Sequence, residues 1–146
     1  MIDAVSGRTF LDDIDLAAVE GSVVRQKLNC LTQDPFLFPD TLRSNVNPPG
    51  DETDGEIVTG LERVGLWSII ESKVGGNSSE PSGVLDNVRD ADFLSHGQRQ
   101  MFCLARAMLE PGKVLILEEP TSSVDLQTDT KMQEIIRSES IIIPPL

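Results

Sequence analysis

Two adjacent carboxylates, Glu118 and Glu119, follow directly after an aliphatic run at Val114–Leu117. A short aliphatic run of this kind is typical of a buried, parallel strand, which expects a neighbouring strand on each side. In open α/β sheets ligands bind beyond the carboxyl ends of the strands, and carboxylates there are suited to hold the Mg²⁺ that accompanies a phosphate. The pair therefore predicts a metal site, although taken alone it also fits a solvated acidic turn.

A second candidate site begins at Ser95. Ser95 and Gln98 have capping-box spacing, and apolar residues follow at helical intervals as far as Met108, which predicts a helix that starts here. Backbone N–H groups at a helix start, together with the Ser95 hydroxyl and Gly97, form an anion-binding arrangement. Ser95 would cap this helix in any case, so the pattern has a purely structural interpretation as well.

The elements that must position these residues alternate between strand-like and helix-like segments, which predicts an α/β fold. The expected elements are a hairpin across Arg8–Leu16 that turns at Asp12-Asp13, a helix at Ser22–Lys27, a strand at Leu28–Thr32, a proline-bounded loop at Asp34–Asp40, helices at Gly55–Leu66 and Trp67–Val74, a break at Gly75–Gly83, and a helix at Leu126–Arg137. The acidic stretch Asp51–Glu56 is interpreted as a solvated loop rather than a metal site.

The composition narrows the classes of protein that fit. The 146 residues carry a net charge of −12, which opposes binding to nucleic acid or to an anionic membrane surface. Cys30 and Cys103 lie without CxxC or Cys/His spacing, so neither a zinc site nor a disulfide framework is indicated. The sequence has no apolar stretch of transmembrane length and no signal-peptide pattern. We therefore expect a soluble chain with an aliphatic core.

Three separated segments together resemble one known family. They are LTQDPFLFPDTLRSNV at 31–46, LSHGQRQMFCLARAML at 94–109 and VLILEEPTSSVD at 114–125. In this order and approximate spacing they resemble the nucleotide-binding domain of ABC transporters, and their residues are similar to those of the C-type, multidrug-resistance-like exporters. The resemblance runs from about Thr9 to Ser138. It implies a partial ABC-type P-loop NTPase domain with a truncated, mostly parallel sheet, a helical lobe at about 44–110, and core parts at 9–33 and 113–146.

The resemblance also implies roles for individual residues. Ser95, His96, Gly97 and Gln98 correspond to the signature motif and, with Asp125 of the D-loop, would contact ATP that a second domain holds. Glu119 corresponds to the catalytic glutamate, which acts on the water that attacks the γ-phosphate, and Gln33 to the Q-loop glutamine, which reaches that water and Mg²⁺. Glu118 stands where the family carries Asp, so its longer side chain puts Mg²⁺ binding in question.

Two motifs of the family have no counterpart in the chain. None of the four lysines lies in a G-x-x-x-x-G-K-S/T context, so the phosphate-cradling Walker A loop is missing. The single histidine, His96, is placed in the signature, so no switch histidine remains. We therefore expect a truncated domain that binds and hydrolyses ATP poorly, or not at all, by itself.

The implied cofactors are ATP and Mg²⁺. The implied partners are a second nucleotide-binding domain in a head-to-tail dimer and the transmembrane domains of a transporter, at the cytoplasmic face of a membrane, with no nucleic acid. Two alternatives stay open at this point. One is a non-catalytic fragment that pairs with a complete ABC ATPase domain, and the other is an ABC-type ATPase that does not transport.

Overall fold

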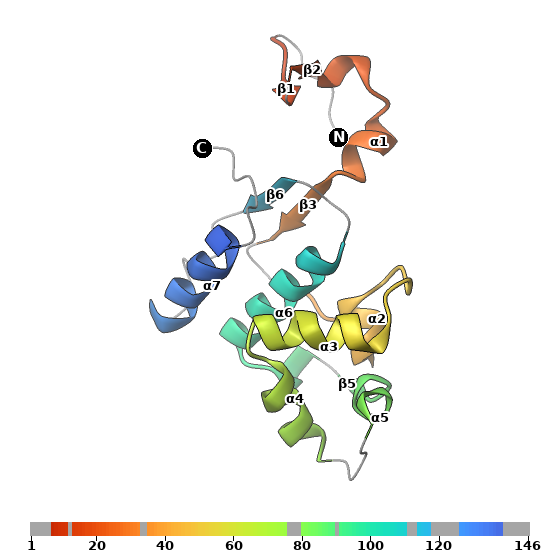
Figure 1. Cartoon of the computed structure of the whole chain (residues 1–146), viewed down its shortest axis with the longest axis vertical. Helices are drawn as coiled ribbons and strands as arrows, with labels where there is room; N and C mark the ends of the chain where they lie inside the picture. Colours follow the sequence, from red (N-terminus) through yellow and green to blue (C-terminus); the bar gives the residue numbers. More distant parts are fainter. Residues whose placement is uncertain are drawn as a thin grey trace.

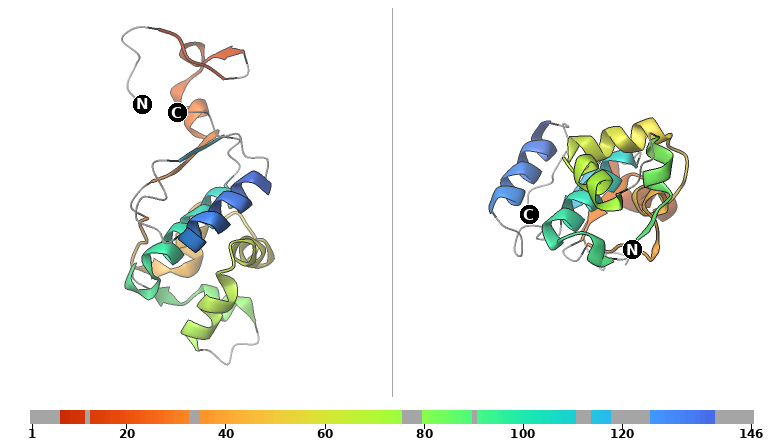
Figure 2. Two further views of the ribbon diagram at one scale, coloured as in Figure 1. Left: turned by 90° about the vertical axis from the view of Figure 1, so that its left-hand side faces the viewer. Right: turned by 90° about the horizontal axis from the view of Figure 1, so that it is seen from below.

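The computed structural model describes residues 7–11, 13–32, 35–75, 80–89, 91–110, 114–117 and 126–138. In Figure 1 the described elements are arranged along the long axis, with a small hairpin at one end, a short parallel sheet in the middle and a group of helices at the other end. The two views of Figure 2 show the same elongated arrangement, with α7 (Leu126–Ser138) lying alongside α6 (His96–Leu109). The sheet and the helices that pack on it determine where the candidate site lies.

The hairpin predicted near the N-terminus is present. β1 (Phe10–Leu11) pairs antiparallel with β2 (Ile14–Asp15), and Asp13 takes the positive φ of 65° that the tight turn requires. A 3-10 turn, η1 (Leu16–Ala18), follows, and Asp15 caps it through the N–H of Ala17. The predicted helix at 22–27 lies slightly earlier, as α1 (Gly21–Arg25).

The parallel sheet consists of β3 (Leu28–Leu31) and β6 (Val114–Leu117), paired from Leu28↔Val114 to Leu31↔Leu117. This confirms the parallel strand predicted at 114–117. A buried parallel strand normally has a neighbour on each side, and among the described residues β3 alone pairs with β6, so one edge of β6 has no partner there. Helix α6 covers the face that carries Asn29 and Leu31, whereas Ile116 on β6 is 39% exposed.

The remaining elements are mostly helices, and several of them start at a recognisable cap. They are β4 (Asp40–Thr41), α2 (Leu42–Val46), α3 (Asp54–Arg63), α4 (Trp67–Val74), α5 (Pro81–Leu85), β5 (Val88–Arg89), paired with β4, and the 3-10 turn η2 (Ala91–Phe93). Helix α5 begins inside the break predicted at 75–83, because Pro81 is suited to the first position of a helix rather than to ending one. The predicted helix at 55–66 ends early, at Arg63, just before Gly65, whose φ of +73° is left-handed.

The core is aliphatic, as the composition predicts. It lies where α3 packs against α6, with α4 and α5 packed on α3, and its fully buried side chains include those of Ile57, Leu61, Ile70, Leu85 and Phe102. Helix α6 contributes most to this core, since residues 100–105 are all buried. Among the described residues, no helix combines the length and the apolar character needed to cross a membrane. The division into a helical lobe at about 44–110 and core parts on either side stays a prediction.

Candidate functional site

The start of α6 has the geometry that the sequence predicts. Ser95 is the N-cap, its Oγ accepts a hydrogen bond from the N–H of Gln98 at 3.3 Å, and Gln98 Oε1 accepts one from the N–H of Ser95 at 3.1 Å. The capping box therefore occupies the N–H groups of these two residues. The N–H groups of His96 and Gly97, which have no acceptor within the helix, are the ones left at this positive end of the helix dipole.

Cationic side chains surround the segment that leads into this helix. Lys73 Nζ on α4 donates to the carbonyl oxygen of Phe93 at 2.9 Å and to Gln98 Oε1 at 3.4 Å. Lys73 and Arg89 also lie 5.5 Å and 5.1 Å from the centre of the Phe93 ring, within cation–π range. Next to them Leu94 is buried in the core. The helix start is thus fixed in place, with the cations of Lys73 and Arg89 beside it and with the exposed carboxylate of Asp92 4.0 Å from Arg99 Nη1.

Two polar side chains of the same helix add unused hydrogen-bonding capacity. In the described part of the chain, Nδ1 of His96 and both amide atoms of Gln100 are buried and lack a hydrogen-bond partner. Buried polar groups are nearly always paired in native proteins, so these atoms are available to a further polar group at the start of α6. Sequence reasoning selected His96 but not Gln100. The feature that could have indicated Gln100 is its position, as a polar residue on the buried side of an amphipathic helix.

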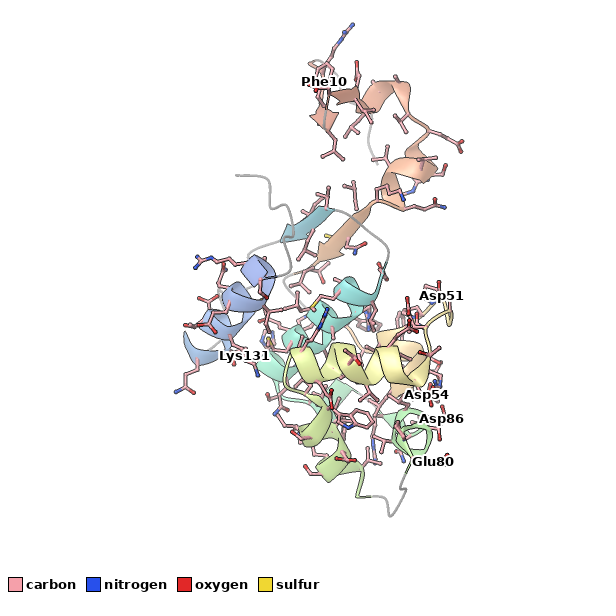
Figure 3. All side chains as sticks on the ribbon, viewed as in Figure 1. Phe10, Asp51, Asp54, Glu80, Asp86 and Lys131 are labelled. Atoms are coloured by element: carbon pink, nitrogen blue, oxygen red, sulfur yellow. The ribbon has the colours of Figure 1, made fainter. Side chains whose placement is uncertain are left out.

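A small depression of about 200 Å³ lies beside Gly97 and Gln98, between α6, the α3–α4 turn and α7. Lys131 of α7, labelled in Figure 3, lies over this turn. Any side chain at Gly65 would place its Cβ 2.1 Å from Lys131 Nζ. Glycine at position 65 therefore allows the positive φ and leaves room for the end of the Lys131 side chain.

The other predicted site residues, Gln33, Glu118, Glu119 and Asp125, lie outside the described residues, so their roles stay predictions. Among the described residues, Leu31 and Leu117 are paired at the carboxyl ends of β3 and β6. Gln33 follows β3 by two residues and Glu118 follows β6 directly. No cluster of three or more His, Cys, Asp or Glu side chains suited to a metal occurs within the described ranges.

Sequence reasoning missed a polar clamp that holds the segment 36–38. Asn45, which is 1% exposed, accepts from the N–H of Phe38 at 2.7 Å and donates to the carbonyl oxygens of Phe38 and Thr41, each at 2.9 Å. Arg106 Nε donates to the carbonyl oxygen of Asn45 at 2.6 Å, and Arg106 Nη2 donates to that of Phe36 at 3.3 Å. The available signal was Asn45 itself, a polar residue between Leu42 and Val46 on the buried face of a short helix.

A second missed network joins three helices of the same region. Arg43 on α2 makes a two-pronged ion pair with Asp54 at the start of α3 and donates from Nε to Asp86 at 2.8 Å, just after α5. Hydrogen bonding to these carboxylates raises the pKa of Arg43, and the Arg43 guanidinium lowers the pKa of Asp54. Figure 3 shows Asp51, Asp54, Glu80 and Asp86 on one side of the helical group. The interpretation of 51–56 as a plain solvated loop is therefore incomplete.

The acidic stretch 51–56 also contains the residues that cap α3. Thr53 is the N-cap, and its Oγ1 accepts from the N–H of Glu56 while Glu56 Oε2 accepts from the N–H of Thr53 at 2.8 Å. Hydrogen bonding to Thr53 lowers the pKa of Glu56. Acidic residues in the first turn also interact favourably with the helix dipole. The carboxylates at 54 and 56 thus stabilise α2 and α3 rather than forming a metal site.

Comparison with known proteins gives a consistent set of relatives. A family model described as ABC transporter matches residues 1–122. The ABC transporter gloK of Glarea lozoyensis is 42% identical over 139 residues, which cover 95% of this chain and 10% of that protein. The ABC multidrug transporter B of Aspergillus fumigatus is 39% identical, with coverage of 95% and 9%. The ATP-binding cassette sub-family C member 2 of Homo sapiens is 38% identical, again with coverage of 95% and 9%.

The chain thus spans about a tenth of the length of these relatives. The family model covers the first two segments on which the resemblance rests and the third as far as residue 122. The relatives match over nearly the whole chain. The chain belongs to the ABC transporter family, and its sequence is that of the ATPase domain of C-type, exporter-like members.

Proposed function

We propose that this chain provides the signature half of an ATP site in an exporter-like ABC transporter. ABC transporter ATPase domains bind ATP with Mg²⁺, and in this chain the capped start of α6 is the observation that supports a nucleotide contact. The N–H groups of His96 and Gly97 and the hydroxyl of Ser95 are suited to phosphate oxygens. Lys73, which donates to Gln98 Oε1 at 3.4 Å, adds a positive charge nearby.

The remaining roles follow from family membership. Gln98 and Asp125 would complete the contact with an ATP held by a second nucleotide-binding domain. Glu119 would act as the base toward the attacking water, and Gln33 and Glu118 would hold Mg²⁺, which supplies charge neutralisation at the phosphates. In this proposal residues 44–110 form the helical lobe, and residues 9–33 and 113–146 belong to the core lobe.

The phosphate cradle must come from outside these 146 residues, since they contain no G-x-x-x-x-G-K-S/T. Each charge-assisted hydrogen bond to phosphate is worth about 1.5–3 kcal/mol, so three missing ones cost about 4.5–9 kcal/mol. A micromolar affinity corresponds to only about 8 kcal/mol. We therefore expect the 146-residue chain alone to bind ATP far more weakly than micromolar and to hydrolyse none.

A transmembrane domain is the second proposed partner, and the segment after Gln33 would provide the contact. Phe36 and Phe38 are 61% and 49% exposed, with their rings edge to face at 4.9 Å between centres. Exposed aromatic pairs of this kind are enriched in protein interfaces. The transported substrate would be selected by the transmembrane domains rather than by this chain.

The test is complementation in trans. The ATPase domain of the Aspergillus fumigatus relative, with its own signature serine replaced by arginine, is mixed with this chain and ATP hydrolysis is measured. The proposal predicts that the chain restores hydrolysis and that Ser95→Arg abolishes the effect, whereas Ser138→Arg, on the exposed end of α7, leaves it unchanged.

Two other outcomes would contradict the proposal in different ways. Inhibition of an intact ATPase domain without any stimulation would identify the chain as a non-catalytic pairing module. Saturable, micromolar ATP binding by the chain alone, measured with a fluorescent nucleotide, would refute the claim that the missing loop is required.

A further inference from the structure

The backbone of the segment 36–38 is bonded from two helices at once. Asn45 on α2 bonds both the N–H and the carbonyl oxygen of Phe38, and Arg106 on α6 bonds the carbonyl oxygens of Phe36 and of Asn45. Arg106 is the residue common to both sides, because it fixes Phe36 directly and Phe38 through the Asn45 backbone. A planar guanidinium can do this because its donors point in fixed, diverging directions.

The side chains of segment 36–38 alternate between exposed and buried. Leu37 is 6% exposed, whereas Phe36 and Phe38 are both mostly exposed. Leu37 therefore anchors the segment in the core while the flanking rings extend into solvent. The backbone N–H of Phe36 also faces the sulfur of Cys103, one turn before Arg106 on α6. The aromatic pair is thus attached to α6 along its backbone rather than carried on a free loop.

Helix α6 connects this attachment to the signature segment. Arg106 and Ser95 are eleven residues apart on one unbroken helix, a distance of about 16 Å along its axis. Between them Phe102, Leu104 and Ala105 are fully buried. Because packed interiors are stiff, a displacement applied at Arg106 moves the whole helix rather than bending it.

We propose that Arg106 is a positioning residue that joins the Phe36/Phe38 pair to the signature helix, so that force on the aromatic pair reaches Ser95–Gln98. The inference rests on the proposed function in one respect, namely that the aromatic pair contacts a transmembrane domain. The link itself is a property of this chain. It requires the two directed hydrogen bonds of Arg106, and a positive charge alone does not provide it.

The first experiment measures how firmly the segment is attached, with Cys103 as the reporter. Cys103 is only 9% exposed and Cys30 is exposed, so the reaction of a thiol reagent is followed in a Cys30→Ser background. We expect Arg106→Met to accelerate the labelling of Cys103 at least about tenfold, which corresponds to about 1.4 kcal/mol. Arg106→Lys should give an intermediate rate. Arg137→Met, on an exposed position of α7, is the matched control and should change nothing.

The second experiment measures the link directly, by NMR on the full 146-residue chain. In the wild-type background Phe36→Ala should shift the backbone amide resonances of His96 and Gly97. With Arg106→Met already present, the same Phe36→Ala change should leave these resonances where they are. A purely structural role of Arg106 would not remove this dependence. Hydrogen exchange at Ile57 and Ile70, in α3 and α4, verifies that the core is intact.

The proposal is overturned if Phe36→Ala shifts the signature amides equally in both backgrounds, or shifts them in neither. It is also overturned if Arg106→Met leaves the Cys103 labelling rate unchanged. If Arg106→Met does not fold, Arg106→Lys retains the charge but has a single donor nitrogen in place of the diverging guanidinium donors, and it is scored by the same two measurements. Neither measurement uses a nucleotide, so a failure of the complementation assay and a failure of this link are separate results.

Discussion

Asn45 offers the sharpest test of how the region around the aromatic pair is held. It is 1% exposed and makes three hydrogen bonds to the backbone of Phe38 and Thr41. A net contribution of about 0.5–1.5 kcal/mol for each bond gives about 1.5–4.5 kcal/mol in total. Because Phe38 is 49% exposed, water can replace part of this loss, so we expect Asn45→Ala to lower the free energy of unfolding by about 1.5–3 kcal/mol.

Asn45→Asp has nearly the same shape and tests the chemistry rather than the volume. One carboxylate oxygen could still accept from the N–H of Phe38, but the other would face the carbonyl oxygens of Phe38 and Thr41. Burial and these carbonyls would raise the pKa of the new carboxyl above its value in the unfolded chain. The penalty should therefore be largest at neutral pH and should fall as the pH drops below the raised pKa, since a protonated carboxyl can donate to a carbonyl.

The assay is urea unfolding of the 146-residue chain, followed by far-UV circular dichroism, for wild type and both variants at pH 7.5 and 4.5. The free energy of unfolding of each variant is compared with that of wild type at the same pH, which cancels the contribution of the native carboxylates. An unchanged slope of this free energy against urea concentration shows that the unfolding reaction is the same. The reasoning is refuted if Asn45→Asp is as stable as wild type at pH 7.5, or if its deficit grows as the pH falls.

Two further predictions concern the ion pair at α3 and the turn before α4. Arg43 lowers the pKa of Asp54, so this pair should stabilise the chain fully above the ordinary Asp pKa of 3.8 and lose its effect as the pH falls through the lowered value. The two side chains are about a third exposed and therefore partly screened by solvent, so Asp54→Asn should cost about 1 kcal/mol. This deficit in urea unfolding should vanish in acid. Gly65→Ala should cost about 1–2 kcal/mol for its left-handed φ, whereas the close contact with Lys131 involves only the end of an exposed side chain. Combining Gly65→Ala with Lys131→Ala should therefore recover little of the lost melting temperature, and a full recovery would show that the contact, not the backbone, is limiting.

Local signals account for the part of the fold that the sequence predicts well. The helix start at Ser95 depends on a capping box, and the strand at 114–117 depends on four consecutive aliphatic residues, so each is encoded within a few positions. Helix α5 was missed because Pro81 has opposite meanings at the first position and in the interior of a helix, and composition alone does not distinguish them.

Local patterns could indicate that Asn45 is buried, but they could not predict the partners that form the polar clamp. Arg106 and Phe36 are 70 positions apart, and their contact exists only once α2 and α6 have packed together. An arginine inside CLARAML is, by spacing alone, a surface residue of an amphipathic helix. Only the folded arrangement shows that the Arg106 guanidinium donates to two backbone carbonyl oxygens. The three family segments can therefore be recognised from the sequence, whereas the hydrogen bonds that join segment 31–46 to segment 94–109 cannot.

The acidic composition and the proposed phosphate contact are compatible once the charges are placed in space. A net charge of −12 opposes long polyanions such as nucleic acid, which extend over many charges. A nucleotide phosphate senses mainly the groups within a Debye length, about 8 Å at physiological ionic strength. Lys73 is bonded to Phe93 and Gln98 at the start of α6, Arg89 lies against Phe93, and the carboxylates at 54 and 86 are paired with Arg43 between α2, α3 and α5. Removing the positive charge of Lys73, by Lys73→Met, should therefore weaken the stimulation in trans without altering the fold of α6, whereas adding salt should weaken it for wild type more than for this variant.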